Sequence, residues 1–235
     1  MRRLPVARQR LRRRGPARPD NLRMSYAVKE IFLTLQGEGV HAGRRAVFLR
    51  FTGCTLWTGR EEDRATAVCQ FCDTDFVGMD GENGGRYNVA ALADKAALLW
   101  GEGTDHRYIV LTGGEPMLQV DDALVDALHT AGFEIAIESN GTIATHPGID
   151  WVCISPKAGS DVIQQSGNEL KLVWPQMGSD IMTLEAWEFD HFLLQPMDSG
   201  NNITNEANRN AAIEQAMLRP KWRISLQNHK LLGLP

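Results

Sequence analysis

Apolar residues of this chain occur in short runs, and the spacing within each run predicts a strand or a helix. Ala27–Leu35 and Ala46–Phe51 are rich in β-branched and aromatic residues, as buried strands are. The glycines of Gln36-Gly-Glu-Gly39 predict a turn between them, which taken alone could be a plain hairpin turn. Val89–Trp100 carries apolar residues at helical spacing after Asn88, which predicts a capped helix.

The second half of the chain alternates between short apolar strands and helices. Helices are expected at Met117–Ala131, which Gly132 ends, and at Ile203–Leu218. Such alternation predicts βα units and a parallel sheet, and therefore an α/β fold class. The periodicity does not distinguish a barrel from an open sheet. The expected strands are Tyr108–Leu111, Phe133–Ile137, Trp151–Ile154, Glu169–Trp174, Phe192–Leu194 and Trp222–Leu226.

Two polar segments interrupt the first half. Thr58–Val68 contains several good helix formers, so a short helix is expected in it. Three glycines in Asp80–Tyr87 predict a flexible loop instead.

The composition is that of one globular domain. At 235 residues, 43% apolar and 23% charged, the chain is long enough for a single α/β domain with a sizeable core. No apolar run approaches the ~20 residues of a membrane span, so we expect a soluble, cytoplasmic protein with no membrane partner. Four cysteines, three of them clustered, suit a reducing compartment better than a disulfide framework.

Charge is unevenly distributed along the chain. Nine Arg and one Asp give residues 1–23 a formal charge of +8, so residues 24–235 must carry −12 for the net charge to be −4. This acidic body argues against nucleic acid as a partner. The Arg-rich head has too little apolar surface to fold and is expected to be disordered. It could be a basic arm or a transit peptide, but the favoured interpretation is untranslated sequence before a start at Met24.

Three cysteines lie in the loop 54–74. Fourteen residues separate Cys54 from Cys69, and two separate Cys69 from Cys72. A closed zinc site would need a fourth ligand, such as a His, whereas an iron–sulfur cluster held by three cysteines leaves one iron open for a further ligand. Incidental buried thiols are the third alternative. The fourth cysteine, Cys153, lies far away in an apolar run.

Polar motifs follow several predicted strands, which is where parallel barrels build their active sites. In the first motif, glycines allow a ligand to approach the backbone and Pro116 suits the first turn of a helix. Taken singly, each of the Pro-containing motifs could equally be a structural turn. The motifs are Thr112-Gly-Gly-Glu-Pro116, Glu138, Ser155-Pro-Lys157 and Gln195-Pro-Met-Asp198.

The cysteines and these motifs together resemble the radical S-adenosylmethionine (SAM) superfamily. Its usual spacing is C-x3-C-x2-C, from which this chain departs with fourteen residues in the first gap. The enlarged gap, Gln36-Gly-Glu-Gly39 and the C-terminal His229-Lys-Leu-Leu-Gly-Leu-Pro235 are more narrowly similar to the 7-carboxy-7-deazaguanine synthase (QueE) family. The resemblance extends from about Met24 to Pro235 and implies a partial parallel (β/α)6-type barrel with the motifs around one opening.

The resemblance implies a set of cofactors. Cys54, Cys69 and Cys72 would hold a [4Fe–4S] cluster, and the Thr74 hydroxyl would bind Mg²⁺, which prefers oxygen ligands. An electron donor such as flavodoxin or ferredoxin and a homodimer are also implied. The implied SAM contacts are Gly114, Glu115, Ser155, Pro156, Lys157, Gln195, Pro196, Met197 and Asp198.

The implied substrate is 6-carboxy-5,6,7,8-tetrahydropterin, which would be converted to 7-carboxy-7-deazaguanine and ammonia. A carboxylate can accept the two parallel N–H donors of its pyrimidinone edge. Glu38, Glu138 and the terminal carboxylate of Pro235 are acceptors of that kind. Arg50, buried in a strand, needs a carboxylate partner from the protein or from a ligand. The implied substrate contacts are Gln36, Gly37, Glu38, Arg50, Thr112, Glu138, His229 and Pro235.

The residues by themselves also allow two other functions. A glycyl-radical-enzyme activase would share the cluster and SAM but would not need Arg50 or Glu38. A non-enzymatic zinc module would bind zinc tightly and be colourless.

Overall fold

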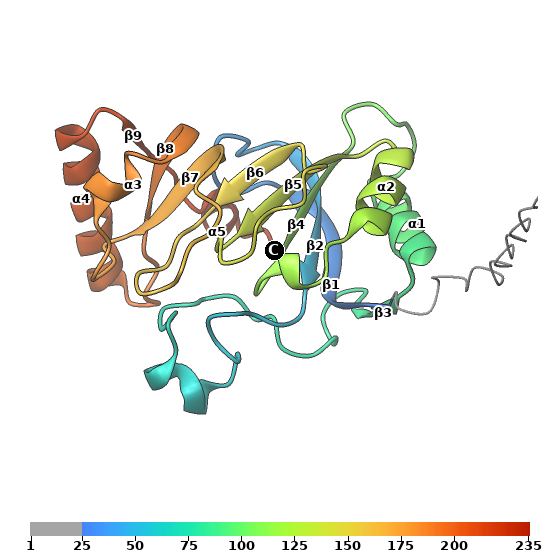
Figure 1. Cartoon of the computed structure of the whole chain (residues 1–235), viewed down its shortest axis with the longest axis horizontal. Helices are drawn as coiled ribbons and strands as arrows, with labels where there is room; N and C mark the ends of the chain where they lie inside the picture. Colours follow the sequence, from blue (N-terminus) through green and yellow to red (C-terminus); the bar gives the residue numbers. More distant parts are fainter. Residues whose placement is uncertain (1–24) are drawn as a thin grey trace, which may run out of the picture.

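The computed structural model describes residues 25–235, which form one nine-stranded sheet in the order β3-β1-β2-β4-β5-β6-β7-β8-β9 (Figure 1). β2 and β4 to β9 run parallel, while β1 pairs antiparallel with both β2 and β3. The expected α/β class with a parallel sheet is confirmed. The strands are β1 (Tyr26–Leu35), β2 (Arg45–Phe51), β3 (Gly85–Tyr87), β4 (Tyr108–Gly113), β5 (Glu134–Ser139), β6 (Trp151–Ile154), β7 (Ser166–Trp174), β8 (Glu188–Pro196) and β9 (Trp222–Ile224).

Helices cover the two ends of the sheet and leave its middle to loops. α1 and α2 pack together beside β1 to β5, and α4 packs on β7 to β9 at the opposite end (Figure 1). The loop that contains η1, teal in Figure 1, projects away from the sheet below its strands. The helices are α1 (Val89–Trp100), α2 (Asp122–Thr130), α3 (Ile181–Leu184), α4 (Asn202–Leu218) and α5 (Asn228–Leu232), with 3-10 helices η1 (Glu61–Thr66) and η2 (Pro116–Leu118).

Two apolar clusters form the core. One is built from β1, β2, β4 and β5 with α1 and α2, and contains fully buried residues such as Leu111 and Leu124. The other joins Leu170, Phe192 and Trp222 beneath α3 and α4. Burying these side chains supplies the main favourable free energy of folding. The strand ends that carry the polar motifs therefore rest on a rigid base.

The predicted helix Met117–Ala131 is wrong as a single element. Asp121 interrupts it, because its side chain accepts from Leu124 N at 3.0 Å and begins α2 as an N-cap. Gln119 also leaves helical geometry, and its amide hydrogen-bonds the backbone of Ala27 and Thr52. These long-range bonds tie η2 to the first strand.

Other differences occur where tertiary contacts override local composition. The end of the predicted loop Asp80–Tyr87 forms β3, because it pairs with β1. The segments 140–150 and 155–165 contain no helix, so two of the expected βα units lack their helices. The short helices α3 and α5 were not predicted, and β7 and β8 begin earlier than expected.

The expectations for residues 1–23 and for a start at Met24 lie outside the described residues.

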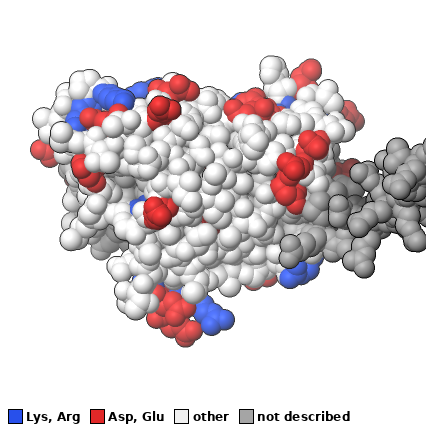
Figure 2. Space-filling view, in the orientation of Figure 1, with Lys and Arg blue, Asp and Glu red and all other residues white. Residues whose placement is uncertain are grey.

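Within residues 25–235, none of the helices has the length and apolar character needed to cross a bilayer. On the face in Figure 2, Lys and Arg form no continuous patch. That distribution agrees with the acidic formal charge of the body.

Candidate functional site

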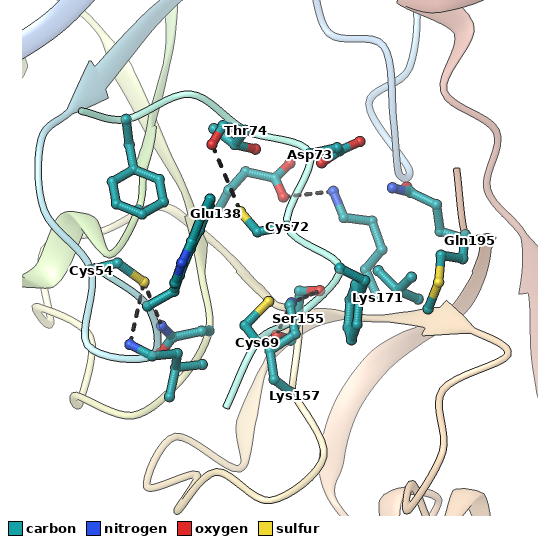
Figure 3. A pocket seen from close by; sticks show the side chains of 18 of the residues that line it. Cys54, Cys69, Cys72, Asp73, Thr74, Glu138, Ser155, Lys157, Lys171 and Gln195 are labelled. Atoms are coloured by element: carbon teal, nitrogen blue, oxygen red, sulfur yellow. Dashed lines mark hydrogen bonds and ion pairs between the residues drawn. The ribbon is translucent and has the colours of Figure 1, made fainter. Parts of the chain in front are cut away.

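The loop between β2 and β3 brings three cysteines to one pocket. Cys54, Cys69 and Cys72 line it, and Figure 3 shows their sulfur atoms facing a common space. Burial raises the pKa of the Cys54 thiol, while a hydrogen bond from Cys69 lowers that of Cys72. Cys153 lies on β6, is 2% exposed and does not line this pocket.

The long gap before Cys69 has a small packed structure of its own. Arg64 donates hydrogen bonds to the carbonyls of Gln70 and Cys72 at 3.0 and 3.1 Å. Its guanidinium lies 4.1 Å from the ring centroid of Trp57, and that ring meets Phe76 edge-on at 5.6 Å. The helix expected in Thr58–Val68 is the 3-10 helix η1. The inserted residues therefore hold the Cys69–Cys72 pair in place.

The Thr112-Gly-Gly turn sets the position of Cys54. A Cβ atom on Gly114 would lie 2.2 Å from Gly53 O and 2.7 Å from Cys54 Cβ. Only glycine allows this approach. The contact is closed by a hydrogen bond of 2.9 Å from Glu115 N to Gly53 O. Gly114 also lines the pocket. A glycine is therefore needed here for backbone packing against Cys54, in addition to the expected contact with SAM.

Glu115 lies behind the pocket rather than in its wall. It is fully buried and accepts from Met117 N, Ser139 Oγ and Asn140 N, each at 2.9 Å. Burial raises its pKa. Asn140 in turn donates to Thr55 Oγ1 at 3.0 Å, next to Cys54. Glu115 therefore acts on the pocket through Asn140, which sequence reasoning missed although it directly follows a strand end.

The loops after β6 and β8 form the opposite wall. Ser155, Lys157 and the segment Gln195–Asp198 line the pocket, whereas Pro156 does not. Lys157 Nζ donates to Ser155 O and Oγ at 2.6 and 2.7 Å. Gln195 is 6% exposed, and its Oε1 has no hydrogen-bond partner within the described residues. A buried acceptor without a partner is costly, which points to a donor from a bound molecule.

A second pocket continues from the first. The two share Glu38, Asp73, Thr74, Glu138 and Gln227 in their walls. Most of the expected substrate contacts line this second pocket: Gln36, Gly37, Glu38, Arg50, Glu138, His229 and Pro235. Thr112 lines neither pocket and lies beside Arg50 in the β2–β4 register.

Arg50 has a partner within the protein. Its Nε donates to Glu30 Oε1 at 2.7 Å, and the two side chains are 20% and 24% exposed. This ion pair uses one edge of the guanidinium fork and leaves its Nη groups for a second carboxylate. Both alternatives for Arg50 are therefore compatible with its position.

A largely buried ion-pair network lies where the two pockets meet, since Glu38 and Glu138 line both pockets and Lys171 lines the first. Lys171 Nζ lies 2.6 Å from Glu38 Oε2 and 2.6 Å from Glu138 Oε2. The remaining oxygens accept from Gln227 Nε2 at 3.0 Å and from Gln36 Nε2 at 3.2 Å. Burial raises the pKa of Glu138, whereas Lys171 lowers that of Glu38 despite its burial. Lys171 was missed because no motif surrounds it in β7, whose sequence mixes polar and apolar residues.

The C-terminal segment contributes to the walls of both pockets, with Gln227 in each and His229, Lys230 and Pro235 in the second. Asn228 N donates to Gly37 O at 2.9 Å, and a Cβ on Gly37 would lie 2.1 Å from His229 Nδ1. Lys230 Nζ pairs with Asp73 at 2.8 Å and with Asp198 at 2.6 Å. α5 thereby connects the cysteine loop, the loop after β8 and the turn after β1.

Comparison with known proteins gives consistent matches, although no family model matches the chain. The protein named 7-carboxy-7-deazaguanine synthase of Bradyrhizobium diazoefficiens is 59% identical over 212 residues, covering 90% of this chain and 100% of that protein. One of the same name from Caulobacter vibrioides is 56% identical over 213 residues with equal coverage. The crystal structure of QueE from Escherichia coli matches with a TM-score of 0.65 and 26% identity, covering 90% of this chain and 99% of that one.

Replacing Cys54, Cys69 or Cys72 by Ala should abolish brown iron–sulfur absorbance and most bound iron after anaerobic reconstitution. The reason is that these three thiolates face one space and each would hold one iron. Visible absorbance and iron content measure the effect. Cys153→Ala is the matched control, since it removes a buried thiol outside this pocket. Equal loss of the cluster in that control would contradict the three-ligand assignment.

Proposed function

This chain belongs to the 7-carboxy-7-deazaguanine synthase family, and we propose on that premise that it converts 6-carboxy-5,6,7,8-tetrahydropterin to 7-carboxy-7-deazaguanine and ammonia. The observation that carries the proposal is the joining of two pockets, one lined by the three cysteines and one by Arg50, Glu38 and Glu138. Neither a glycyl-radical activase nor a zinc module gains support, because relatives of full-length coverage are named synthases.

The first pocket fits a [4Fe–4S] cluster and SAM. Three thiols line this pocket, and Cys153, the fourth cysteine of the chain, does not line it, so a cluster would keep one iron open. The unpaired Oε1 of Gln195 offers an acceptor to SAM. When bound, the cluster and SAM supply the radical that removes a hydrogen atom from the substrate. The protein's part is to hold these groups beside the second pocket and to limit the access of water.

The second pocket fits a flat molecule with an anionic end and an N–H donor end. Arg50 offers the free part of its guanidinium to the substrate carboxylate. Glu38 and Glu138 offer acceptors to the two N–H groups of the pyrimidinone edge. These two ends of the pocket would orient the ring so that its reacting carbon faces the first pocket.

The proposal also includes a bound Mg²⁺, an electron donor, a homodimer and a cytoplasmic location. Thr74 lines both pockets and is flanked by Asp73 and Asp75, so its hydroxyl could hold a Mg²⁺ that also binds the substrate carboxylate. A flavodoxin or ferredoxin would supply electrons. Homodimer formation and a cytoplasmic location follow from the family resemblance alone.

Anaerobic reconstitution tests the reaction. The protein, reconstituted with iron and sulfide and given SAM, a reductant and the carboxy-tetrahydropterin, should form 7-carboxy-7-deazaguanine and ammonia, detected by chromatography and mass spectrometry. Omitting SAM should abolish product formation. A brown, SAM-binding protein that forms no product from this substrate would overturn the proposal.

Thr74→Ala should weaken the dependence of turnover on Mg²⁺ concentration while leaving the affinity for SAM unchanged. The expected cause is the loss of one oxygen ligand next to the substrate carboxylate. Thr66→Ala removes an exposed hydroxyl of the same loop and serves as the control. A Mg²⁺ titration of Thr74→Ala that matches that of the unmodified protein would remove Thr74 from the metal site.

Gln195→Leu should weaken SAM binding roughly tenfold without lowering the melting temperature. Its Oε1 has no partner within the described residues, and an unsatisfied buried acceptor costs about 1–3 kcal/mol, so an apolar replacement relieves a cost in the free protein. Isothermal titration with SAM and thermal unfolding measure the two effects. Gln165→Leu, at an exposed position, is the control. Unchanged SAM affinity in Gln195→Leu would mean that this acceptor does not bind SAM.

A further inference from the structure

We propose that Lys171 is a positioning residue that holds Glu38 and Glu138 as one fixed pair of carboxylates, and that this pair selects ligands with an N–H donor edge. The inference rests on the proposed function, because it concerns how the same pocket recognises its substrate. Lys171 was not among the residues that the sequence indicated, and its ammonium lies at the boundary between the two pockets.

Among the contacts of the described residues, Lys171 is the side chain that binds both carboxylates, while Gln36 joins the Glu138 carboxylate to the backbone N–H of Glu38. Glu38 lies in the turn after β1, and Glu138 lies near the end of β5. Lys171 Nζ contacts Oε2 of each at 2.6 Å, while their Oε1 atoms bond to different glutamines. Figure 3 shows the Lys171 side chain reaching from its strand to Glu138. Without this ammonium, the two carboxylates would have no common partner, and only the glutamine contacts would hold each of them.

The charge around Lys171 is unbalanced. Glu138, Cys153 and Glu169 are neighbours across β5, β6 and β7, and Lys171 lies two residues beyond Glu169 on β7. Together with Glu38, the carboxylates of Glu138 and Glu169 make three acidic groups of low exposure against the one ammonium of Lys171, which leaves a formal charge of −2. Such an environment favours N–H donors and disfavours a ligand carboxylate. The charged and titratable groups facing this network are Glu38, Glu138, Cys153, Glu169, Lys157, His41, Tyr108 and His229.

A metal ion is the competing occupant of this cluster. The possible donor atoms of Glu138, Cys153 and Glu169 lie within 4.8 Å of one another. However, Lys171 already contacts Glu138 and is 3% exposed, so a metal ion would face an ammonium in the same space. The Lys171 ammonium therefore supplies the positive charge that a metal ion would otherwise supply to these carboxylates.

Removing the ammonium should change the protonation of the pair. In Lys171→Met, two buried carboxylates would face each other, and one would hold a proton because like charges raise the pKa of one member. A protonated carboxyl presents an O–H donor where the substrate needs an acceptor. Substrate affinity should fall at least roughly tenfold near neutral pH. It should recover as the pH rises through the raised pKa, because the binding-competent carboxylate forms above that value.

A second substitution separates charge from structure. Lys171→Met combined with Glu38→Gln removes one positive and one negative charge, so the formal charge of −2 in the unmodified cluster is restored. This double variant should bind the substrate more tightly than Lys171→Met alone, although it has lost one acceptor. A side chain needed only for packing would give no such recovery.

The experiment is a titration of the reconstituted, SAM-bound protein with 6-carboxy-5,6,7,8-tetrahydropterin, anaerobically and without reductant, at several pH values from about 6 to 9. The proteins compared are the unmodified chain, Lys171→Met, Lys171→Arg, the double variant and Lys221→Met. Lys221 is the matched control because it is exposed and contacts Glu185 O and the Phe192 ring. Iron content, SAM affinity and melting temperature are measured for each.

Lys171→Met should show weak, pH-dependent binding with normal iron content and SAM affinity. Lys171→Arg, which keeps the charge, should bind better than Lys171→Met, and it remains informative with the double variant if Lys171→Met fails to fold. The inference is overturned if Lys171→Met loses substrate affinity equally at every pH and the double variant shows no recovery. It is also overturned if Lys171→Met loses no substrate affinity. If the unmodified protein binds SAM but neither binds nor converts the pterin, the proposed function fails instead.

Discussion

The site depends on the parallel arrangement of seven strands, β2 and β4 to β9, each of which pairs with the next one in the sheet. This arrangement places the carboxyl ends of these strands at one edge. Glu138, Ser155 and Gln195, which are far apart along the chain, therefore open onto connected pockets. The two apolar clusters beneath them hold the strand ends, and hydrogen bonds such as those of Glu138 to Gln36 and Lys171 fix the side chains at these ends.

The cysteine loop depends on close backbone packing at one end and on side-chain contacts at the other. Gly114 allows the backbone of Gly53 and Cys54 to approach the turn after β4. Arg64 binds the carbonyls of the Cys69–Cys72 pair across the long gap. The gap is therefore a packed element that sets the position of two thiols relative to the third, and its length is not simply an insertion.

Burial strengthens the interactions between charged side chains in the two pockets. Lys171 and its two glutamates are largely removed from water, so each charge must be paired or neutralised. Arg50 satisfies the same requirement with Glu30 at the other end of the second pocket. The Arg50–Glu30 pair is formally neutral, whereas the network around Lys171 keeps a net negative charge, so the two parts of this pocket differ in electrostatic character.

The sequence by itself determined the α/β class, most strand positions, the cysteine triplet and the family, because periodicity and motif spacing are local properties. It was wrong on the helix Met117–Ala131, since Gln119 and Asp121 make bonds to the first strand that local propensity cannot anticipate. The expected ligand contacts of Glu115 and Thr112 stay predictions, and both residues lie behind the pocket walls rather than in them. Only the tertiary structure decided that Lys171 joins Glu38 to Glu138, because the sequence shows a lysine in a strand of mixed polarity but not which carboxylates, from distant parts of the chain, are brought together to neutralise it.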